Sequence, residues 1–91
     1  MYTAILECEE TVGLAANKEK TKVMKETFRE NEGLLSIYVN HDTLDEIAES
    51  LARLQTLSGL SKTDYLSECA AIKLKLDYIK KDSGVNLHSV F

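Results

Sequence analysis

The feature that most constrains the fold of this chain is a turn signal, residues 59–63 (GLSKT), between two stretches with helical periodicity. Apolar residues recur every three or four positions on both sides of it, as they do along the buried face of an amphipathic helix. Gly59 stands where a helix commonly ends in a left-handed residue. The sequence therefore predicts two consecutive helices, the first counted from Leu44 to Gly59. Their predicted buried stripes are Leu44, Ile47, Ala48, Leu51 and Leu54, and then Leu66, Cys69, Ile72, Leu76 and Ile79 with Tyr65 beside them.

Capping residues mark the ends of both predicted helices. Asn40 or Asp42 can accept a backbone hydrogen bond at the start of the first helix. Ser61 opens the second helix, and Asp64 three residues later completes a capping box. The run Asp-Ser-Gly at residues 82–84 ends this helix.

Upstream of the helices, residues 35–39 (LSIYV) alternate apolar and polar side chains, which is the pattern of a short strand with one buried face. Leu35, Ile37 and Val39 are expected on the buried face. Leu34, Ser36 and Tyr38 are expected on the other face. A strand this short needs a partner strand, and a second copy of the chain is the simplest source of one.

The two ends of the chain have weaker patterns. Residues 1–33 are interpreted as an N-terminal extension, partly helical and mobile, in which residues 2–6 fit a short strand and residues 17–31 fit a helix. Residues 31–33 are expected to be a break. In the C-terminal tail, residues 83–91, the apolar residues either dock on a partner chain or remain free.

Length and composition fit one small soluble domain. The chain has 91 residues, of which 44% are hydrophobic and 29% charged. It contains no apolar run of about 18 residues that could cross a bilayer, and its start lacks the basic region of a signal peptide, so a cytoplasmic location is expected. The net charge of −4 argues against indiscriminate nucleic-acid binding but not against site-specific binding.

The sequence offers no set of residues typical of an enzyme. Cys8 and Cys69 lack the spacing of a metal site or a redox pair, and Cys69 is expected to be buried. His41 is interpreted as a turn residue, and His88 has no second ligand at a useful spacing. A nucleophile with its base, a carboxylate pair or a metal cluster cannot be assembled. We therefore expect no enzymatic activity, no cofactor and no metal.

The GLSKT run, placed after the alternating segment, resembles the ribbon-helix-helix family of small bacterial and phage DNA-binding proteins, and especially its plasmid copy-number repressor branch. The resemblance covers residues 34–80, within an expected ribbon-helix-helix domain at residues 34–82. It implies a mainly α fold with one short strand (α+β) and an intertwined homodimer with a two-stranded antiparallel ribbon. The residues then expected in the dimer core are Leu35, Ile37, Val39, Leu51, Leu66 and Cys69.

The same resemblance implies a function, namely sequence-specific binding of double-stranded DNA by the homodimer, with higher-order assembly on the DNA left open. The ribbon would read the major groove, as in a transcriptional repressor or a plasmid or phage accessory regulator. The residues expected to contact bases are Leu34, Ser36 and Tyr38. The residues expected to contact phosphate are Ser61, Lys62 and Thr63, at a helix N-terminus. Further phosphate contacts are hypothesised for Lys18, Lys20, Lys22 and Lys25.

A second function stays open from the sequence. On the same scaffold, the chain would be a protein-binding module, antitoxin-like or a phage inhibitor, that uses residues 1–33 or 85–91 to hold a partner. Its acidic charge suits a basic partner. Dependence of DNA binding on Ser36 and Tyr38 distinguishes the two functions.

Overall fold

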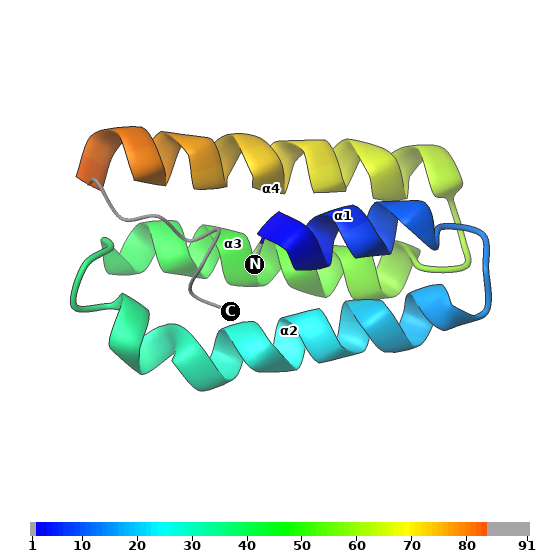
Figure 1. Cartoon of the computed structure of the whole chain (residues 1–91), viewed down its shortest axis with the longest axis horizontal. Helices are drawn as coiled ribbons and strands as arrows, with labels where there is room; N and C mark the ends of the chain where they lie inside the picture. Colours follow the sequence, from blue (N-terminus) through cyan, green and yellow to red (C-terminus); the bar gives the residue numbers. More distant parts are fainter. Residues whose placement is uncertain (1, 84–91) are drawn as a thin grey trace.

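Four helices account for most of residues 2–83, which are the residues that the computed structural model describes (Figure 1). They are α1 (Tyr2–Glu10), α2 (Ala16–Leu35), α3 (His41–Leu57) and α4 (Lys62–Ser83). Successive helices run in opposite directions (Figure 1). Both α1 and α3 pack against α2 and α4. The arrangement is an up-down-up-down four-helix bundle in which the first helix is the shortest.

All four helices contribute apolar side chains to one core. Ile5 on α1 and Phe28 on α2 are fully buried, as are Leu51 on α3 and Leu76 on α4. Residues 2–33, within the segment expected to be an extension, therefore provide α1 and most of α2, and several of their side chains are part of the core. The other buried apolar residues are Cys8, Met24, Leu35, Val39, Leu44, Ile47, Leu54, Tyr65, Cys69, Ile72 and Ile79.

The predicted turn and caps around α3 and α4 are confirmed. Asn40 is the N-cap of α3, and its side chain accepts a 2.8 Å hydrogen bond from the backbone N–H of Asp42. Gly59 has a φ of 83°, the left-handed region in which a β-carbon is strained. At the start of α4, the Asp64 N–H donates a 3.3 Å hydrogen bond to the Ser61 hydroxyl.

The predicted strand at residues 35–39 is wrong, and the α+β ribbon-helix-helix fold is wrong with it. Among residues 2–83 the structure contains no strand. The backbone N–H of Val39 donates to the carbonyl of Leu35 at 2.9 Å, in a helical turn that follows α2. Leu35 and Val39 are buried, whereas Ile37 between them is 71% exposed. Burial thus follows the four-residue spacing of a helix and not the alternation of a strand.

Two further expectations near the N-terminus differ from the structure. Residues 2–6 lie in α1 instead of a strand, and α2 continues through Gly33 to Leu35 instead of breaking at residues 31–33. A glycine inside a helix costs only about 1 kcal/mol. Phe28 and Leu35, two turns apart, are both buried in the core, so tertiary packing stabilises the helix across Gly33.

The six residues expected in a dimer core differ in how far they are buried. Leu66 is half-buried on α4, and Ile37 is exposed. The four others are buried inside one chain, namely Leu35, Val39, Leu51 and Cys69. A single copy of the chain therefore buries these four residues by itself, and dimer formation stays a prediction.

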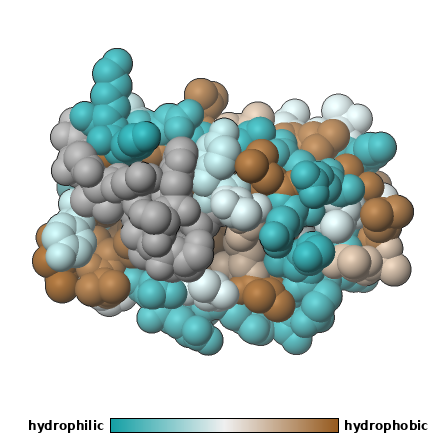
Figure 2. Space-filling view, viewed as in Figure 1, coloured by the Kyte–Doolittle hydropathy of each residue, from teal (hydrophilic) through white to brown (hydrophobic). Residues whose placement is uncertain are grey.

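The surface of the bundle mixes polar and apolar residues. Hydrophilic residues cover much of the face seen in Figure 2, and hydrophobic residues form separate patches among them. At one end, Leu14 in the α1–α2 turn and Leu60 in the α3–α4 turn are exposed. None of the helices in residues 2–83 combines the length and the apolar character needed to cross a membrane.

Candidate functional site

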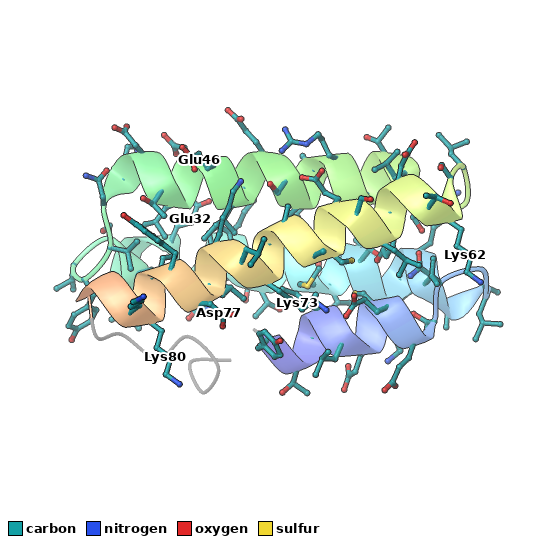
Figure 3. All side chains as sticks on the ribbon, turned by 90° about the horizontal axis from the view of Figure 1, so that it is seen from above. Glu32, Glu46, Lys62, Lys73, Asp77 and Lys80 are labelled. Carbon is teal, nitrogen blue, oxygen red and sulfur yellow. The ribbon has the colours of Figure 1, made fainter. Side chains whose placement is uncertain are left out.

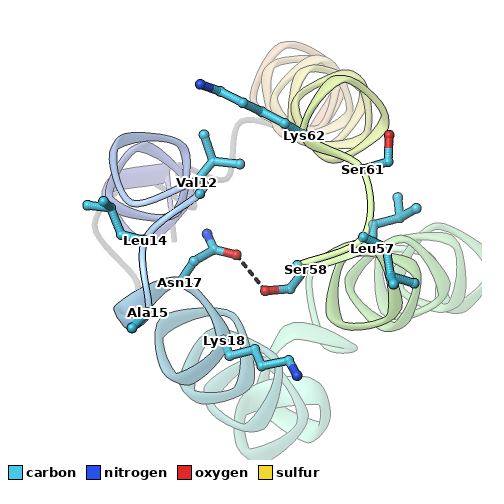
Figure 4. Close-up of a pocket in the computed structure, with 12 residues that line it drawn as sticks. Val12, Leu14, Ala15, Asn17, Lys18, Leu57, Ser58, Ser61 and Lys62 are labelled. Atoms are coloured by element: carbon cyan, nitrogen blue, oxygen red, sulfur yellow. Dashed lines mark hydrogen bonds between the residues drawn. The ribbon is translucent and has the colours of Figure 1, made fainter.

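A pocket of about 500 Å³ opens at one end of the bundle, between the α1–α2 turn and the α3–α4 turn (Figure 4). Two of the three residues predicted to contact phosphate, Ser61 and Lys62, line it. The first turns of α2 and α4 both lie at this end of the bundle. The other lining residues are Val12, Gly13, Leu14, Ala15, Asn17, Lys18, Leu57, Ser58, Gly59 and Leu60.

The buried polar groups of this pocket bond to one another. The Ser58 hydroxyl donates a 2.6 Å hydrogen bond to Asn17 Oδ1 (Figure 4). Asn17 Nδ2 donates to the Cys8 carbonyl at 2.9 Å and to Thr11 Oγ1 at 3.4 Å. Asn17 thereby joins α1 and the α1–α2 turn to the end of α3. These contacts fasten one end of the bundle and satisfy the Asn17 side chain within the chain itself.

The same network continues into the core through a second pair. The Thr21 hydroxyl donates to the Asn17 carbonyl at 2.8 Å, and its oxygen lies 2.6 Å from the Tyr65 hydroxyl. Because the one Thr21 proton points to Asn17, Tyr65 is the donor in the second bond. Burial raises the pKa of Tyr65 above its usual value, so the phenol is neutral and fixes α4 to α2.

The two cysteines do not form a reactive site. Both Cys8 and Cys69 are buried and free. Burial raises the pKa of the Cys69 thiol to about 12, and burial also raises the pKa of the Cys8 thiol. Both thiols are protonated at neutral pH and are poor nucleophiles. Among the described residues, no group of three or more His, Cys, Asp or Glu side chains could hold a metal ion. That the chain is not an enzyme stays a prediction.

The structure separates the residues predicted to contact DNA. Leu34, Ser36 and Tyr38 are exposed at the end of α2 and in the turn that follows it. Residues 61–63 begin α4 at the opposite end of the bundle (Figure 1). A single ribbon face with flanking phosphate contacts, as the resemblance implied, is therefore absent from residues 2–83.

The lysines hypothesised to contact phosphate are spread along α2. Lys20 lies 3.8 Å from Glu7, and Lys25 donates a 3.0 Å hydrogen bond to Gln55. Lys18 lines the pocket, and Lys22 is exposed. Two of these four side chains thus contact neighbouring helices.

Helix α4 has a second apolar face that the predicted single buried stripe does not include. Ala70, Leu74 and Tyr78 follow one another at four-residue intervals and are exposed, Leu74 by 70% and Tyr78 by 66%. We call these three residues the outer stripe. The inner stripe of the same helix is Tyr65, Cys69, Ile72, Leu76 and Ile79, all buried. Apolar residues on both sides of one helix are typical of a helix with packing partners on both sides.

The lysines that flank the outer stripe turn away from it. Lys73 Nζ lies 2.9 Å from a carboxylate oxygen of Glu9 on α1, on the α1 side of α4 (Figure 3). On the other flank, Lys75 Nζ donates a 3.2 Å hydrogen bond to the Ser50 hydroxyl on α3. Both ammonium groups next to Leu74 are therefore held by neighbouring helices, and the charged residue that lies beside the middle of the outer stripe is the exposed Asp77. The repeated four-residue spacing in α4 is the sequence signal that could have revealed this face.

Comparison with known proteins identifies a family and no function. No curated protein and no solved structure matches the chain. Residues 13–90 match the family model described as a domain of unknown function, DUF4363, and this match begins in the α1–α2 turn. The resemblance to ribbon-helix-helix proteins is therefore wrong, both by family and by the absence of a strand in residues 2–83. Because the matched segment covers most of its length, the chain belongs to the DUF4363 family.

Proposed function

We propose that this chain is a protein-binding helical module that holds a partner helix on the outer stripe of α4. One observation supports the proposal most directly: α4 is apolar on two sides, and only the inner side is covered within residues 2–83. The core of a protein interface is typically poor in charge and rich in aromatic residues. Leu74 and Tyr78 supply such a centre, and the neighbouring lysines are bonded elsewhere.

The charges at the two ends of α4 indicate the chemistry of the partner helix. Asp64 lies in the first turn, and Lys80 and Lys81 lie in the last turn. A helix that lies antiparallel on α4 places its own C-terminus beside Asp64 and its N-terminus beside the two lysines. The matching partner is an amphipathic helix with an apolar stripe, acidic residues near its N-terminus and basic residues near its C-terminus.

Sequence-specific DNA binding stays a prediction that has lost its structural basis. The residues expected to read bases lie in a helix end and a turn instead of a ribbon. The net charge of −4 does not favour contact with phosphates. The exposed outer stripe of α4 supports protein binding, which is the second function expected from the sequence. Residues 2–33 form α1 and most of α2, which contribute side chains to the core, and residues 85–91 lie outside the described residues. A cytoplasmic location remains part of this proposal.

The proposal is tested with a probe helix of the stated chemistry. The probe is a fluorescent synthetic peptide of 22 residues, the length of α4, with a Leu and Ala stripe, glutamates in its first turn and lysines in its last. We expect saturable binding, measured by fluorescence anisotropy, that weakens at least tenfold in Leu74→Glu. Val23→Glu is the matched control, because Val23 is also an exposed apolar residue, 49% exposed on α2. Equal affinity for the natural and the Leu74→Glu chains overturns the proposal, and so does the absence of binding at concentrations where the natural chain is monomeric.

The same instrument tests DNA binding. We expect the natural chain to show no saturable preference for one duplex sequence over a scrambled one at any salt concentration. A sequence preference with a steep dependence on salt, reduced by Lys62→Ala, would instead favour a DNA-binding function.

A further inference from the structure

We infer that the helix held on the outer stripe is α4 of a second copy of this chain, placed antiparallel about a two-fold axis at Leu74. This inference rests on the proposed function, since it names the partner of the same surface. The resulting assembly is a symmetric homodimer in which the same face of each copy is used.

The spacing of the outer stripe makes it complementary to itself. Leu74 lies midway between Ala70 and Tyr78, four residues from each. An antiparallel two-fold axis at Leu74 therefore places Ala70 of one copy opposite Tyr78 of the other. The small side chain leaves room that the aromatic ring fills, and symmetry repeats this contact on the other side of the axis. The two Leu74 side chains meet at the axis, so the three residues form a surface that is small at one end and large at the other and fits its own copy.

The charges of α4 favour the same orientation. In an antiparallel pair with the axis at Leu74, Lys81 in the last turn of one α4 lies opposite Ser67 of the other, three residues from Asp64 in its first turn. The dipoles of the two helices are then opposed, which is also favourable. A parallel pair would bring the two lysine-rich turns together. The helix therefore meets every requirement derived above for the partner: an apolar stripe, an acidic first turn and a basic last turn.

An ion pair on one flank and a hydrogen bond on the other already hold the lysines beside this surface in the single copy. Three charged residues lie beside the axis at Leu74, namely Lys73, Lys75 and the exposed Asp77. Like residues of the two copies would approach each other there. The bonds of the two lysines to Glu9 and to Ser50 direct both ammonium groups towards the same copy's α1 and α3. The lysines thus do not oppose the approach of a second α4.

The first test is the mass of the chain in solution, measured by sedimentation equilibrium over a wide range of concentrations. We expect a reversible dimer for the natural chain and for the Val23→Glu control, and a monomer for Leu74→Glu with unchanged helical circular dichroism. A natural chain that stays monomeric at millimolar concentration, or a Leu74→Glu chain that still dimerises, overturns the inference. The peptide titration distinguishes failure of this inference from failure of the proposed function. If the natural chain is monomeric but binds the peptide through Leu74, only the identity of the partner is wrong, whereas failure of both experiments overturns the proposed function as well.

The second test is the orientation of the two helices, measured by disulfide cross-linking. Ala70→Cys and Tyr78→Cys chains are oxidised with glutathione disulfide, separately and as an equal mixture. We expect the mixed cross-link between the two variants to exceed either self-cross-link by about tenfold, because an axis at Leu74 pairs residue 70 with residue 78. The buried thiols of Cys8 and Cys69 provide little background. Self-cross-linking of the Ala70→Cys chain as efficient as that of the mixture overturns the antiparallel arrangement.

Discussion

The inner and outer stripes of α4 are two apolar faces of one helix with opposite surroundings. On the inner face, Cys69 and Leu76 are fully buried against neighbouring helices of the bundle. On the outer face, Leu74 and Tyr78 remain exposed. Local sequence makes the two faces alike, and the rest of the chain decides which one is covered. An apolar pattern thus specifies burial, while the number of neighbours that one copy can supply decides whether folding or association provides it.

The two tyrosines of α4 also differ in burial and in the surroundings of their hydroxyl groups. Tyr65 on the inner face is fully buried, and its hydroxyl is bonded to Thr21 at 2.6 Å. Tyr78 on the outer face is 66% exposed. A tyrosine with an apolar ring and a hydroxyl near water is common in interfaces between proteins. The inner tyrosine therefore fixes the fold, and the outer one is suited to a partner.

The largest contrast is expected in thiol reactivity, because Cys69 is buried on the inner stripe of α4 and its neighbour Ala70 is exposed on the outer stripe. The natural Cys69 reacts with an aromatic disulfide reagent only after the bundle opens. For an unfolding free energy of about 5 kcal/mol, its rate falls on the order of 10³-fold below that of an open thiol. The thiol introduced by Ala70→Cys should react at nearly the open rate. Equal rates for the two positions, followed by absorbance at low protein concentration, would place Cys69 on the surface.

Truncation of one leucine on each face gives the next largest contrast. Leu76→Ala leaves a cavity in the core and should lower the free energy of unfolding by about 2–5 kcal/mol. Leu74→Ala, which removes the same atoms from an exposed side chain, should change it by no more than about 0.5 kcal/mol. Urea unfolding at a concentration where both chains are monomeric measures the two values. A large loss in Leu74→Ala would show that the outer stripe is part of the folded core.

Removing one hydroxyl from each tyrosine should give a smaller difference. Tyr65→Phe leaves the Thr21 oxygen without its donor in a buried position, which costs about 1–3 kcal/mol of stability. Tyr78→Phe should be nearly neutral in the monomer. The measurement is again urea unfolding, and Thr21→Val provides a check, because it removes the other partner of the same bond. Loss of stability in Tyr78→Phe equal to that in Tyr65→Phe would contradict the assignment of faces.

The smallest effect is expected from an ion pair on the flank between the two faces. Burial raises the pKa of the Glu68 carboxyl, but hydrogen bonds from Arg53 and Ser50 outweigh burial and hold the pKa below its ordinary value of 4.5. A carboxyl with a lower pKa in the folded state stabilises the fold above the unfolded pKa, and this contribution is lost as the pH falls through the folded value. Glu68→Gln should therefore flatten the decline of stability below about pH 4.5, as followed by unfolding at a series of pH values. An unchanged pH profile would show that the pair contributes nothing.

The sequence predicted α3 and α4 well because their signals are long and agree with one another. Many apolar positions repeat the helical spacing, and the caps at Asn40 and Ser61 mark the starts. The segment at residues 35–39 is different, because a run of five residues fits two periods. Leu35 and Val39 are compatible with a strand and with a helix, and only the exposed Ile37 separates the two. No property of Ile37 alone indicates that it is exposed.

Other parts of the structure depend on contacts that no local pattern contains. Helix α1 has only nine residues, too few for a stable isolated helix, so packing of Ile5 and Cys8 determines its structure. The bond between Asn17 and Ser58 joins residues 41 positions apart, and neither residue has a distinctive neighbour. The outer stripe, in contrast, is visible as a second four-residue repeat in α4. The prediction of one buried stripe per helix leaves this second repeat out.

The melting temperature of the natural chain over a hundredfold range of protein concentration tests the role of the outer stripe most directly. If α4 binds a second copy, the folded dimer is stabilised by mass action and the melting temperature rises with concentration. The same series on Leu74→Glu should give one constant value, equal to that of the natural chain at the lowest concentration. A natural chain whose melting temperature does not change with concentration, or a Leu74→Glu chain whose melting temperature rises in parallel, would contradict the account.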